Sequence, residues 1–270
     1  MAHCGLLRMP ASSAVAALQP LISISIVSHG DRQPLVTLLE SITAHEAIGR
    51  IQLVVTDNLG NDLPDLAPSG WHSILFLRPK QPRGFAVNHN AAFEAAAGQF
   101  FCILNPDVEF TQSVFEQLLG HLEDSRGHIA APALVDSRGS LQDSFRALPT
   151  PWEMACRRMG VAAPMPPLDS GSLLFPDWIA GMFMLMRGAT FSRLGGFDAR
   201  YRLYFEDVDL CTRLRLAGMR VVVDPSLRLL HDPRRRSRVP GRHLIWHTQS
   251  AIRFFWSDTY RRARRLGQDA

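Results

Sequence analysis

The chain has 270 residues and a formal net charge of +4, and 46% of its residues are hydrophobic and 9% aromatic. These fractions support a packed core and exclude wholesale disorder. The positive charge suits anionic small molecules or a membrane surface, and taken alone it also fits nucleic acid. No uninterrupted apolar run approaches the roughly 20 residues of a membrane-spanning helix, which predicts a soluble or peripheral protein.

The first 20 residues are expected to form a loose extension. Arg8, Pro10 and Pro20 interrupt the apolar content that a signal peptide would need. The four cysteines of the chain are scattered and form no CxxC pair. Two of them, Cys102 and Cys211, fall within apolar elements. We therefore expect buried free thiols in a reducing compartment and no zinc site.

Four apolar runs in the first half are typical of buried strands, at 22–27, 51–56, 74–77 and 100–104. Helical patterns separate them. The first helix has Asp31 as its N-terminal cap, the second covers 85–97 and ends at Gly98, and a third is capped by Thr111 and runs to about Glu123. This alternation predicts an α/β fold with an open, mostly parallel central sheet and helices on both faces.

The second half is less regular. Strands are expected at 129–135, 141–145, 181–186 and 220–224, and helices at 206–216 and 244–255. The last helix is expected to turn Ile245, Ile252 and Phe255 inward. Six prolines between 149 and 176 predict a long irregular segment. Because no repeat and no clean linker is present, we expect a single domain with two functional halves.

The strand at 100–104 stops abruptly at Asn105-Pro106-Asp107. A carboxylate just past a buried parallel strand lies at the carboxyl edge of the sheet, where ligands bind in open α/β folds. Asn105 and Asp107 would place two oxygen-bearing side chains on one side of an extended turn, which suits a hard divalent cation. An ordinary strand-to-helix turn is the alternative, because all three residues are common in turns.

Asp57 follows the second strand as Asp107 follows the fourth. The two carboxylates could share one crevice, where Asp57 would accept a hydrogen bond from a base imide or a ribose hydroxyl; a simple turn beside Asn58 is the alternative. Arg83 and Gly84 precede a helix whose free N–H groups could meet a phosphate. A solvated arginine is the alternative at that position.

Three carboxylates, Glu206, Asp207 and Asp209, lie within four residues at the start of a helix. Acidic residues there are favoured by the helix dipole, which is the structural alternative. A carboxylate pressed against Tyr204 and Phe205 would have a raised pKa and could act as a general base. Further on, His231 ends an apolar run beside an arginine cluster, a combination that suits a metal–diphosphate site.

Together these segments resemble an inverting family 2 glycosyltransferase of the GT-A fold, nearest to a bacterial rhamnosyltransferase-like branch. The segments that carry the resemblance are ISIVSH, VVTDNLGND, RGFAVNHNAAFEAA, ILNPDVEF, RLLHDPRRRS and, most specifically, the block from WIAGMFMLMRG to YFEDVDLC. They extend from Ile22 to about Phe255. The resemblance implies a nucleotide-binding half at 21–110 and an acceptor half at 111–240, between an extension at 1–20 and a C-terminal amphipathic helix and basic tail at 241–270.

The resemblance also implies roles for individual residues. Asp207 would be the catalytic base, and the acceptor would contact Glu206, Trp178 and Gly181. Mg²⁺ or Mn²⁺ would be held by Asp107 and His231. The nucleotide-sugar donor would contact six residues: Ser28, Asp57, Arg83, Gly84, Asn90 and Asn105. Two positions depart from the family pattern, because Ser28-His29 replaces the usual Tyr-Asn or Thr-Asn and Asn105 stands where many members have Asp.

The implied reaction is transfer of a sugar, foremost rhamnose from dTDP-rhamnose, to a hydroxyl of a cell-surface glycan or lipid-linked acceptor. It would take place in the cytoplasm or on the inner face of an anionic membrane, without a nucleic-acid partner. A UDP-hexose transferase of the same fold is the alternative. A sugar nucleotidyltransferase is disfavoured by the single glycine in SHGDRQP. A further alternative is a protein that only binds an anionic surface, and the arginines at 234–238 and 261–265 are the residues that would support it.

Overall fold

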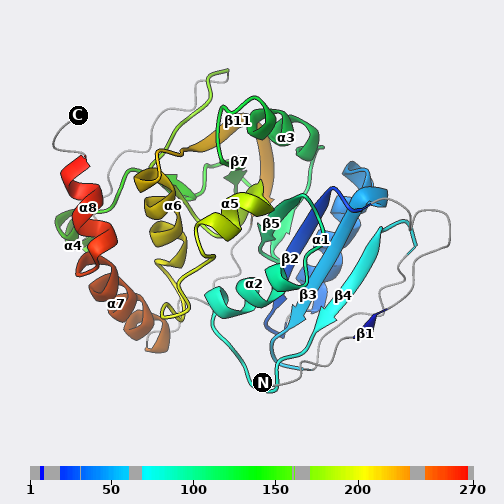
Figure 1. The fold of residues 1–270 in the computed structure, drawn as a ribbon, viewed down its shortest axis with the longest axis horizontal. Helices are drawn as coiled ribbons and strands as arrows, with labels where there is room; N and C mark the ends of the chain where they lie inside the picture. Colours follow the sequence, from blue (N-terminus) through cyan, green and yellow to red (C-terminus); the bar gives the residue numbers. More distant parts are fainter. Residues whose placement is uncertain are drawn as a thin grey trace.

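A computed structural model of the protein describes residues 7–8, 19–30, 32–60, 69–159, 161, 171–231 and 241–266. Within them, nine strands form one sheet in the order β1-β4-β3-β2-β5-β10-β7-β11-β6 (Figure 1). Its strands are β1 (Leu7–Arg8), β2 (Ile22–Ser28), β3 (Ile51–Asp57), β4 (Ser73–Leu77), β5 (Phe100–Leu104), β6 (Val108–Glu109), β7 (Ile129–Val135), β10 (Phe183–Arg187) and β11 (Val221–His231). A separate two-stranded sheet joins β8 (Phe145–Arg146) to β9 (Trp178–Ile179).

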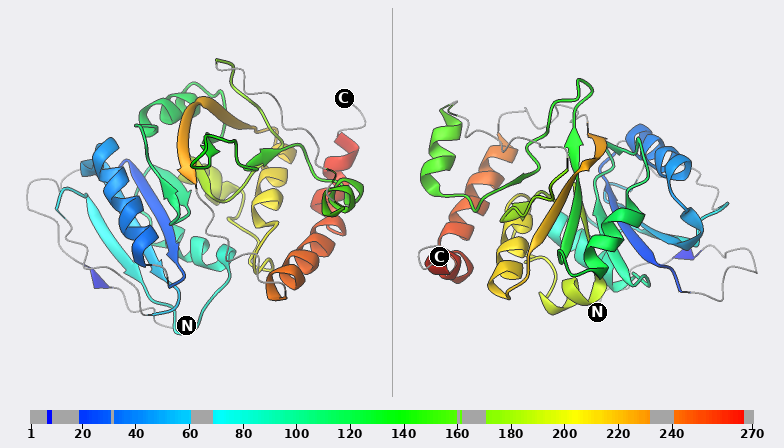
Figure 2. Two further views of the ribbon diagram at one scale, coloured as in Figure 1. Left: turned by 180° about the vertical axis from the view of Figure 1, so that it is seen from behind. Right: turned by 90° about the horizontal axis from the view of Figure 1, so that it is seen from above.

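The helices surround this sheet. They are α1 (Arg32–His45), the 3-10 turn η1 (Ile48–Arg50), α2 (Phe85–Glu94), α3 (Phe115–Glu123), α4 (Pro151–Arg158), α5 (Gly188–Arg193), α6 (Glu206–Leu216), α7 (Arg242–Phe255) and α8 (Asp258–Leu266). Helix α2 lies in front of the sheet in Figure 1 and α1 in front of it in the rear view of Figure 2, so the two cover opposite faces. None of the described helices combines the length and the apolar content that a membrane crossing requires.

The parallel half of the sheet confirms the four strands predicted from the first half of the sequence. β2 pairs in parallel with β3 on one side and with β5 on the other, and β4 extends β3. Every residue of β2, β3 and β5 is buried, as expected for strands covered on both faces. α1 buries its predicted apolar face, and its predicted cap Asp31 lies outside the described residues.

Beyond β5 the sheet becomes mixed. β10 runs antiparallel to both β5 and β7, whereas β11 runs parallel to β7 and antiparallel to β6. The parallel ladders contain most of the paired residues of this sheet, so the predicted mostly parallel α/β sheet is confirmed. Because one sheet carries residues from Ile22 to His231, both halves of the chain share a single core.

Several boundaries in the second half differ from the sequence prediction. The strand expected at 141–145 is the short β8, with Leu141 in an isolated bridge to Val135. The strand expected at 181–186 is β10, which begins only at Phe183, and the short β9 precedes it at 178–179. The strand expected at 220–224 continues to His231, through a register irregularity after Asp224. The irregular segment contains helix α4, and its residues 160 and 162–170 lie outside the described part.

Thr111 does not cap the helix that follows it. Its hydroxyl donates to the carbonyl of Arg228, and α3 begins only at Phe115. The first free N–H groups of α3, those of Val114 and Phe115, donate instead to one carboxylate oxygen of Glu46 at the end of α1. A distant carboxylate thus replaces the local cap, which no short sequence pattern would indicate.

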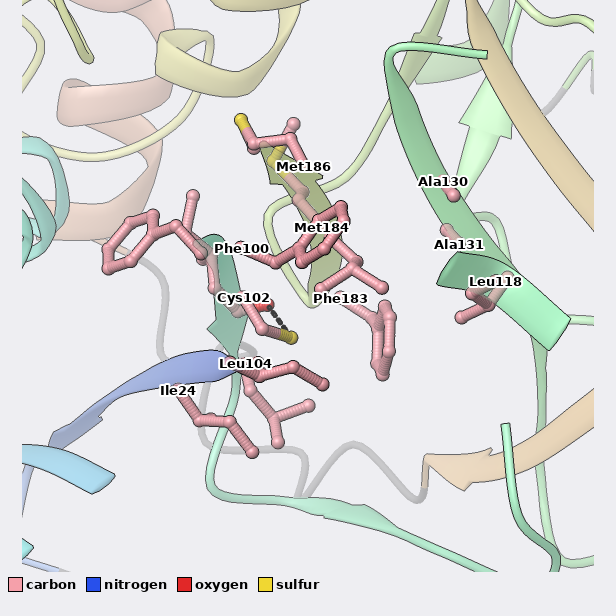
Figure 3. Close-up of a cluster of buried hydrophobic side chains, with 14 of the residues drawn as sticks. Ile24, Phe100, Cys102, Leu104, Leu118, Ala130, Ala131, Phe183, Met184 and Met186 are labelled. Carbon is pink, nitrogen blue, oxygen red and sulfur yellow. Dashed lines mark hydrogen bonds between the residues drawn. The ribbon is translucent and has the colours of Figure 1, made fainter. Parts of the chain in front are cut away.

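The main core lies between β5, β10 and the neighbouring strands. Figure 3 shows Phe100, Cys102 and Leu104 of β5 beside Met184 and other apolar side chains of β10. Cys102 and Cys211 are free and fully buried, as predicted, and burial raises the pKa of the Cys211 thiol to about 12. These thiols therefore stay protonated and serve as small apolar side chains.

A second apolar cluster joins α6 to the C-terminal helices. Its buried residues are Tyr201, Phe205, Val208, Ala251, Phe254 and Tyr260. The predicted helix 206–216 is confirmed as α6. The predicted inward face of α7 is wrong, because Ile245 and Ile252 are 55% and 57% exposed. α7 instead buries Ser250, Ala251 and Phe254 against the loop that precedes α6.

Candidate active site

Strand register brings the predicted donor-binding residues to one edge of the sheet. Ser28 at the end of β2 is directly opposite Asp57 at the end of β3, and Ile26 is opposite Leu104 at the end of β5. Asn105 follows at once, and its N–H donates to the carbonyl of Met182, next to Gly181. The carboxyl ends of three parallel strands and the entry into β10 therefore form one continuous edge, the usual ligand position of such folds.

Asp57 offers an open hydrogen-bond acceptor at this edge. Its Oδ1 accepts a 2.7 Å hydrogen bond from the N–H of Gly60. Its buried Oδ2 has no hydrogen-bond partner among the described residues, and the guanidinium of Arg78 lies 3.8 Å away. The hydroxyls of Ser28 and Thr56 are also buried without a partner in the described part of the chain. Buried polar atoms are normally satisfied, so this group indicates a position that a ligand completes.

Asn58 holds the Arg83 loop beside that group, a role that the sequence interpretation missed. Its Oδ1 accepts from the N–H of Arg83 at 2.9 Å, and its Nδ2 donates to the carbonyl of Arg83 at 3.0 Å. The backbone of Arg83 is thereby fixed while its side chain remains exposed. The available signal was the Asp57-Asn58 pair itself, which the sequence interpretation treated as a turn.

Gly84 and Asn90 are both occupied by packing against the loop before α6. A Cβ on Gly84 would collide with the carbonyl oxygen of Arg202, which also accepts a hydrogen bond from the N–H of Phe85. The side-chain amide of Asn90 donates to the carbonyl of Phe197 at 2.8 Å and accepts from its N–H at 2.9 Å. The helix predicted to bind donor thus also supports the acceptor half.

His89, on the same helix, is completely buried between aromatic rings, with Phe85 and Phe197 as neighbours. Burial lowers the pKa of its imidazole to about 3, so this histidine is neutral throughout the physiological range. Its Nδ1 is 2.7 Å from the hydroxyl of Ser25 on β2. His89 therefore anchors α2 on the sheet and takes no part in proton transfer.

Asp107 and His231 come together from distant parts of the chain. β6 pairs antiparallel with the end of β11, which places His231 opposite Val108. His231 Nε2 lies 3.4 Å from Asp107 Oδ1, and neither Asp107 Oδ1 nor His231 Nδ1 has a hydrogen-bond partner among the described residues. Imidazole and carboxylate groups with unused lone pairs fit a divalent cation.

The protein supplies only part of a coordination shell at this position. No group of three or more His, Cys, Asp or Glu side chains suited to a metal exists within the described residues. Mg²⁺ in nucleotide-dependent enzymes is commonly held by one or two carboxylates and by substrate phosphates. Asp107 and His231 match that pattern, in which the remaining oxygens come from the diphosphate and from water.

Asp207 lies at the start of α6 and is oriented by two main-chain N–H groups. Gly181 donates to its Oδ2 at 3.0 Å and Val208 donates to its Oδ1 at 2.8 Å. Burial raises the pKa of Asp207, and the two donors oppose part of that rise. A carboxylate whose pKa is moved toward neutrality, and which keeps two fixed donors, has the properties of a general base.

Glu206 differs from its neighbour. It is buried, and its Oε2 has no hydrogen-bond partner in the part of the chain that the structure describes. Burial raises the pKa of Glu206 well above the ordinary value, with a further contribution from the charge of Asp207. Glu206 thus holds the proton of the pair more tightly, which leaves Asp207 as the ionised member.

The backbone before this pair has an unusual conformation. Tyr204 and Phe205 have φ values of 70° and 67°, in the left-handed region that residues with side chains rarely adopt. Phe205 is nevertheless fixed by the rings of Phe254 and His247, and Tyr204 lies 3.2 Å from His243 Nδ1 through its hydroxyl. Packing against α7 therefore maintains the turn that presents Glu206 and Asp207.

The remaining residues of the acceptor side stabilise the structure around Glu206 and Asp207. Asp209 accepts a 2.7 Å hydrogen bond from Arg213, whose other nitrogens donate to the carbonyls of Leu194 and Gly196. Asp209 is thus committed to an internal ion pair. Trp178 donates through its indole to the carbonyl of Ala147 and packs on both apolar clusters. A Cβ on Gly181 would lie 2.7 Å from the Phe85 ring, so this position has room only for glycine.

A family model described as glycosyl transferase family 2 matches residues 23–167, more than half of the chain. The chain belongs to this family. Among its relatives, rhamnosyltransferase WbbL of Escherichia coli K12 is 29% identical over 246 residues, covering 87% of this chain and 92% of the relative. An N-acetylglucosaminyl-diphospho-decaprenol L-rhamnosyltransferase of Mycobacterium tuberculosis is 30% identical over 235 residues, covering 76% of this chain and 74% of the relative.

Solved structures confirm the GT-A glycosyltransferase fold. GalNAc-T7, solved with UDP, GalNAc and Mn²⁺, aligns with a TM-score of 0.66 at 15% identity and covers 90% of this chain. The chain spans about half of that protein, because only 49% of GalNAc-T7 is covered. A mannosyltransferase of Pyrobaculum calidifontis with GDP-mannose and Mn²⁺ aligns with a TM-score of 0.55 at 17% identity, over 88% of this chain and 66% of its own. The family 2 chain is therefore a glycosyltransferase.

Proposed function

We propose that this glycosyltransferase moves rhamnose from dTDP-rhamnose to a hydroxyl of a cell-surface glycan or lipid-linked glycan, with inversion at the anomeric carbon. The observation that carries this proposal is Asp207, a half-buried carboxylate held by Gly181 at the same sheet edge as Asn105 and Asp107. The rhamnosyl donor is supported by the two relatives, which are rhamnosyltransferases by name. A lipid-linked acceptor is supported by the decaprenol-linked substrate named for the mycobacterial relative.

The nucleotide would bind at the ends of β2 and β3. Asp57 Oδ2, which has no hydrogen-bond partner among the described residues, would accept from the imide of the base or from a ribose hydroxyl. The hydroxyl of Ser28 beside it likewise has no partner within the described ranges. Arg83, fixed through its backbone by Asn58 and exposed through its side chain, would reach a phosphate. We assign Gly84 and Asn90 to holding the Arg202 and Phe197 segments against this half.

The diphosphate would meet Asn105, Asp107 and His231. Asp107 and His231 would hold Mg²⁺ or Mn²⁺, which when bound supplies the positive charge that the diphosphate leaving group requires. Asn105 contributes an amide where a second carboxylate would add charge, so it would contact donor oxygens or sugar hydroxyls. His231 thereby receives a larger share of metal binding than in a site with two aspartates.

Asp207 would take the proton from the acceptor hydroxyl as that oxygen attacks the anomeric carbon. Glu206, which keeps its own proton, would orient the acceptor by donating a hydrogen bond, and Trp178 and Gly181 would shape the acceptor side. A single displacement from the face opposite the diphosphate inverts the centre through an oxocarbenium-like transition state. No second carboxylate is needed as a nucleophile, which is consistent with the commitment of Asp209 to Arg213.

A UDP-hexose transferase of the same fold is the second candidate, because the neighbour GalNAc-T7 was solved with UDP. Nucleotide release from dTDP-rhamnose and from UDP-glucose, UDP-galactose and UDP-N-acetylglucosamine separates the two, with a lipid-linked N-acetylglucosaminyl acceptor present. We expect turnover with dTDP-rhamnose to exceed the others by at least about 10²-fold, since correct hydroxyl contacts discriminate strongly. Faster turnover with a UDP-sugar would replace the donor assignment, and a product with retained anomeric configuration would exclude inversion.

We also propose that the enzyme works in the cytoplasm at the inner face of the cell membrane, where a lipid-linked acceptor would be presented. The arginines at 261–265 support attraction to an anionic surface, and the second predicted cluster at 234–238 lies outside the described residues.

A further inference from the structure

Helix α7 presents an unpartnered apolar stripe. Ile245, Ile252 and Trp256 follow one another at spacings of seven and four residues, which places them on one side of the helix. Their exposed fractions are 55%, 57% and 78%. The opposite side of α7 is fully used, because Phe254 and Ala251 pack against the turn before Glu206. The stripe is therefore not required for the internal packing of α7.

Arginines border this stripe. Between positions 242 and 266 the chain has six arginines and one acidic residue, Asp258, which pairs with Arg261. A groove of about 890 Å³ borders the C-terminal part of the stripe, and its lining includes Arg202, Trp246, Ile252, Arg253, Trp256 and Arg261. Arg202 stacks over Trp246 at 4.8 Å, and neither Arg202 nor Arg253 forms an ion pair in the described part of the chain.

The combination of groups identifies the kind of partner. Exposed Trp and Ile side chains beside unpaired arginines match an interfacial helix, whose apolar residues enter the acyl boundary while its cations meet lipid phosphates. A second copy of this chain fits poorly, because a two-fold interface through this patch would bring two arginine-rich surfaces together. We propose that the α7 stripe and its arginine groove dock this protein on an anionic phospholipid bilayer.

Docking through α7 would also position the catalytic turn. The hydroxyl of Ser250 on α7 donates to the carbonyl of Leu203 at 2.9 Å, and Tyr204 and Phe205 pack on α7 side chains. Glu206 and Asp207 follow immediately. Figure 1 shows α7 and α8 on the side of the molecule away from β3 and β4, so a bilayer bound there would leave the nucleotide half free. This consequence for acceptor delivery rests on the proposed function, whereas the docking itself does not.

Vesicle flotation of the full chain tests the docking without any sugar substrate. One set of vesicles contains phosphatidylcholine alone, and the other contains phosphatidylcholine with roughly 30% phosphatidylglycerol, which provides the anionic surface. Both sets are tested at low and at high salt. We expect binding to the anionic vesicles only, weakened by salt. Ile252→Ser combined with Trp256→Ser should reduce binding about tenfold or more, and Arg253→Gln should reduce it to a smaller extent.

Two matched variants serve as controls. Phe175→Ser changes another half-exposed aromatic residue, packed on Arg220 beside β11, and Arg126→Gln changes another exposed arginine, paired with Asp124. Both should float like the unchanged protein. Trp256→Phe, which preserves the fold, should remove most of the fluorescence quenching that brominated lipids cause. Equal binding to neutral vesicles, no binding to either, or full quenching in Trp256→Phe would overturn the proposal.

Activity separates this inference from the proposed function. The stripe variants should keep the turnover of a water-soluble acceptor analogue and lose turnover of an acceptor embedded in anionic vesicles. If no donor supports transfer but flotation follows the pattern above, the proposed reaction fails and the docking surface stands. If transfer proceeds equally in the stripe variants and the unchanged protein on vesicles, and flotation is unaltered, the docking surface fails and the reaction stands.

Discussion

The main-chain N–H of Gly181 donates a 3.0 Å hydrogen bond to Oδ2 of Asp207, 26 residues further along the chain. The next residue, Met182, accepts through its carbonyl from the N–H of Asn105 at 3.0 Å. The segment between β9 and β10 therefore connects the start of α6 to the end of β5. Because Gly181 and Met182 contribute main-chain atoms to these two contacts, one continuous backbone segment links the carboxylate of Asp207 to the Asn105–Asp107 turn.

Asp207→Asn preserves the shape of the side chain and removes its ability to accept a proton. We expect turnover to fall by roughly 10²–10⁴, the usual contribution of a general base, with donor affinity barely changed. In the unchanged enzyme, kcat should fall as the pH drops through the raised pKa of Asp207, since only the ionised form is active. Steady-state kinetics and titration of dTDP-rhamnose measure both quantities. Preserved turnover with lost donor affinity would make Asp207 a donor ligand and move the base to Glu206.

Asp107→Ala tests the metal assignment. Removal of the carboxylate should lower turnover by about 10³-fold or more, because charge stabilisation of a leaving group by a metal amounts to several kcal/mol. It should also remove the effect of Mn²⁺ on nucleotide binding, measured by thermal shift with dTDP, while the melting temperature without ligand stays close to that of the unchanged protein. Full activity would exclude Asp107 as a metal ligand. Glu116→Gln, an exposed carboxylate on α3, is the control.

Asn105→Asp restores the second carboxylate found in many family members. The added charge should strengthen Mn²⁺-dependent binding of dTDP and leave turnover within a few-fold of the unchanged enzyme, because a hard cation favours carboxylate over amide oxygen. Calorimetric titration of Mn²⁺ in the presence of dTDP measures the change. Weaker metal binding in this variant would indicate that the Asn105 amide has a structural role that a carboxylate cannot fulfil.

The Asn90→Ala variant tests whether Asn90 supports the fold or contacts the donor. Asn90→Ala deletes two hydrogen bonds to the main chain of Phe197, so we expect a loss of roughly 1–3 kcal/mol in the free energy of unfolding. The Michaelis constant for donor should change less than twofold at a temperature where the variant is folded. For Arg83→Ala we expect the reverse result: the free energy of unfolding stays unchanged and donor binding becomes weaker. A large donor effect without loss of stability would return Asn90 to the donor site.

Much of this fold follows from local patterns. The runs at 22–27, 51–56 and 100–104 combine β-branched or aromatic residues with strand length, and all three are buried strands in the structure. Asn105, Asp107 and Asp207 were identified because polar residues interrupt such runs or begin a helix. The contacts that bring these residues to one edge could not be predicted. They depend on the pairing of β6 with β11 and on the hydrogen bond between Gly181 and Asp207, which join distant parts of the chain.

The dependence on tertiary contacts also explains why some predictions from the sequence were wrong. The periodicity of α7 shows that Ile245, Ile252 and Phe254 cannot all face one side, but it does not show which side meets the protein. Thr111 looks like a helix cap locally, yet Glu46 fulfils that role from another helix. Asn58 looks like a turn residue, and its function appears only when the Arg83 loop lies against it. In each case a tertiary contact selects among locally equivalent choices.

Glu206→Gln tests the assignment of the proton to Glu206 through stability. In the folded protein, burial and the nearby charge of Asp207 raise the pKa of Glu206 well above 4.5, whereas the unfolded chain has the ordinary value. Between these two pKa values the folded state keeps a proton that the unfolded state has lost. Stability therefore falls as the pH rises from about 4.5 toward the folded pKa, by up to about 1.4 kcal/mol per pH unit.

Glutamine has no proton to lose and keeps the oxygen that accepts the N–H groups of Tyr204 and Glu206. The melting temperature of Glu206→Gln should thus match that of the unchanged protein near pH 4 and exceed it increasingly as the pH rises toward the folded pKa of Glu206. Glu116→Gln should show no such divergence, because that side chain is exposed. When Glu206→Gln is compared in an Asp207→Asn background, the difference in melting temperature should begin to level off at lower pH. The reason is that removal of the charge of Asp207 lowers the pKa of Glu206. A melting-temperature difference that is constant with pH would mean that Glu206 is ionised in the folded protein, and it would remove the proton that we assign to orienting the acceptor.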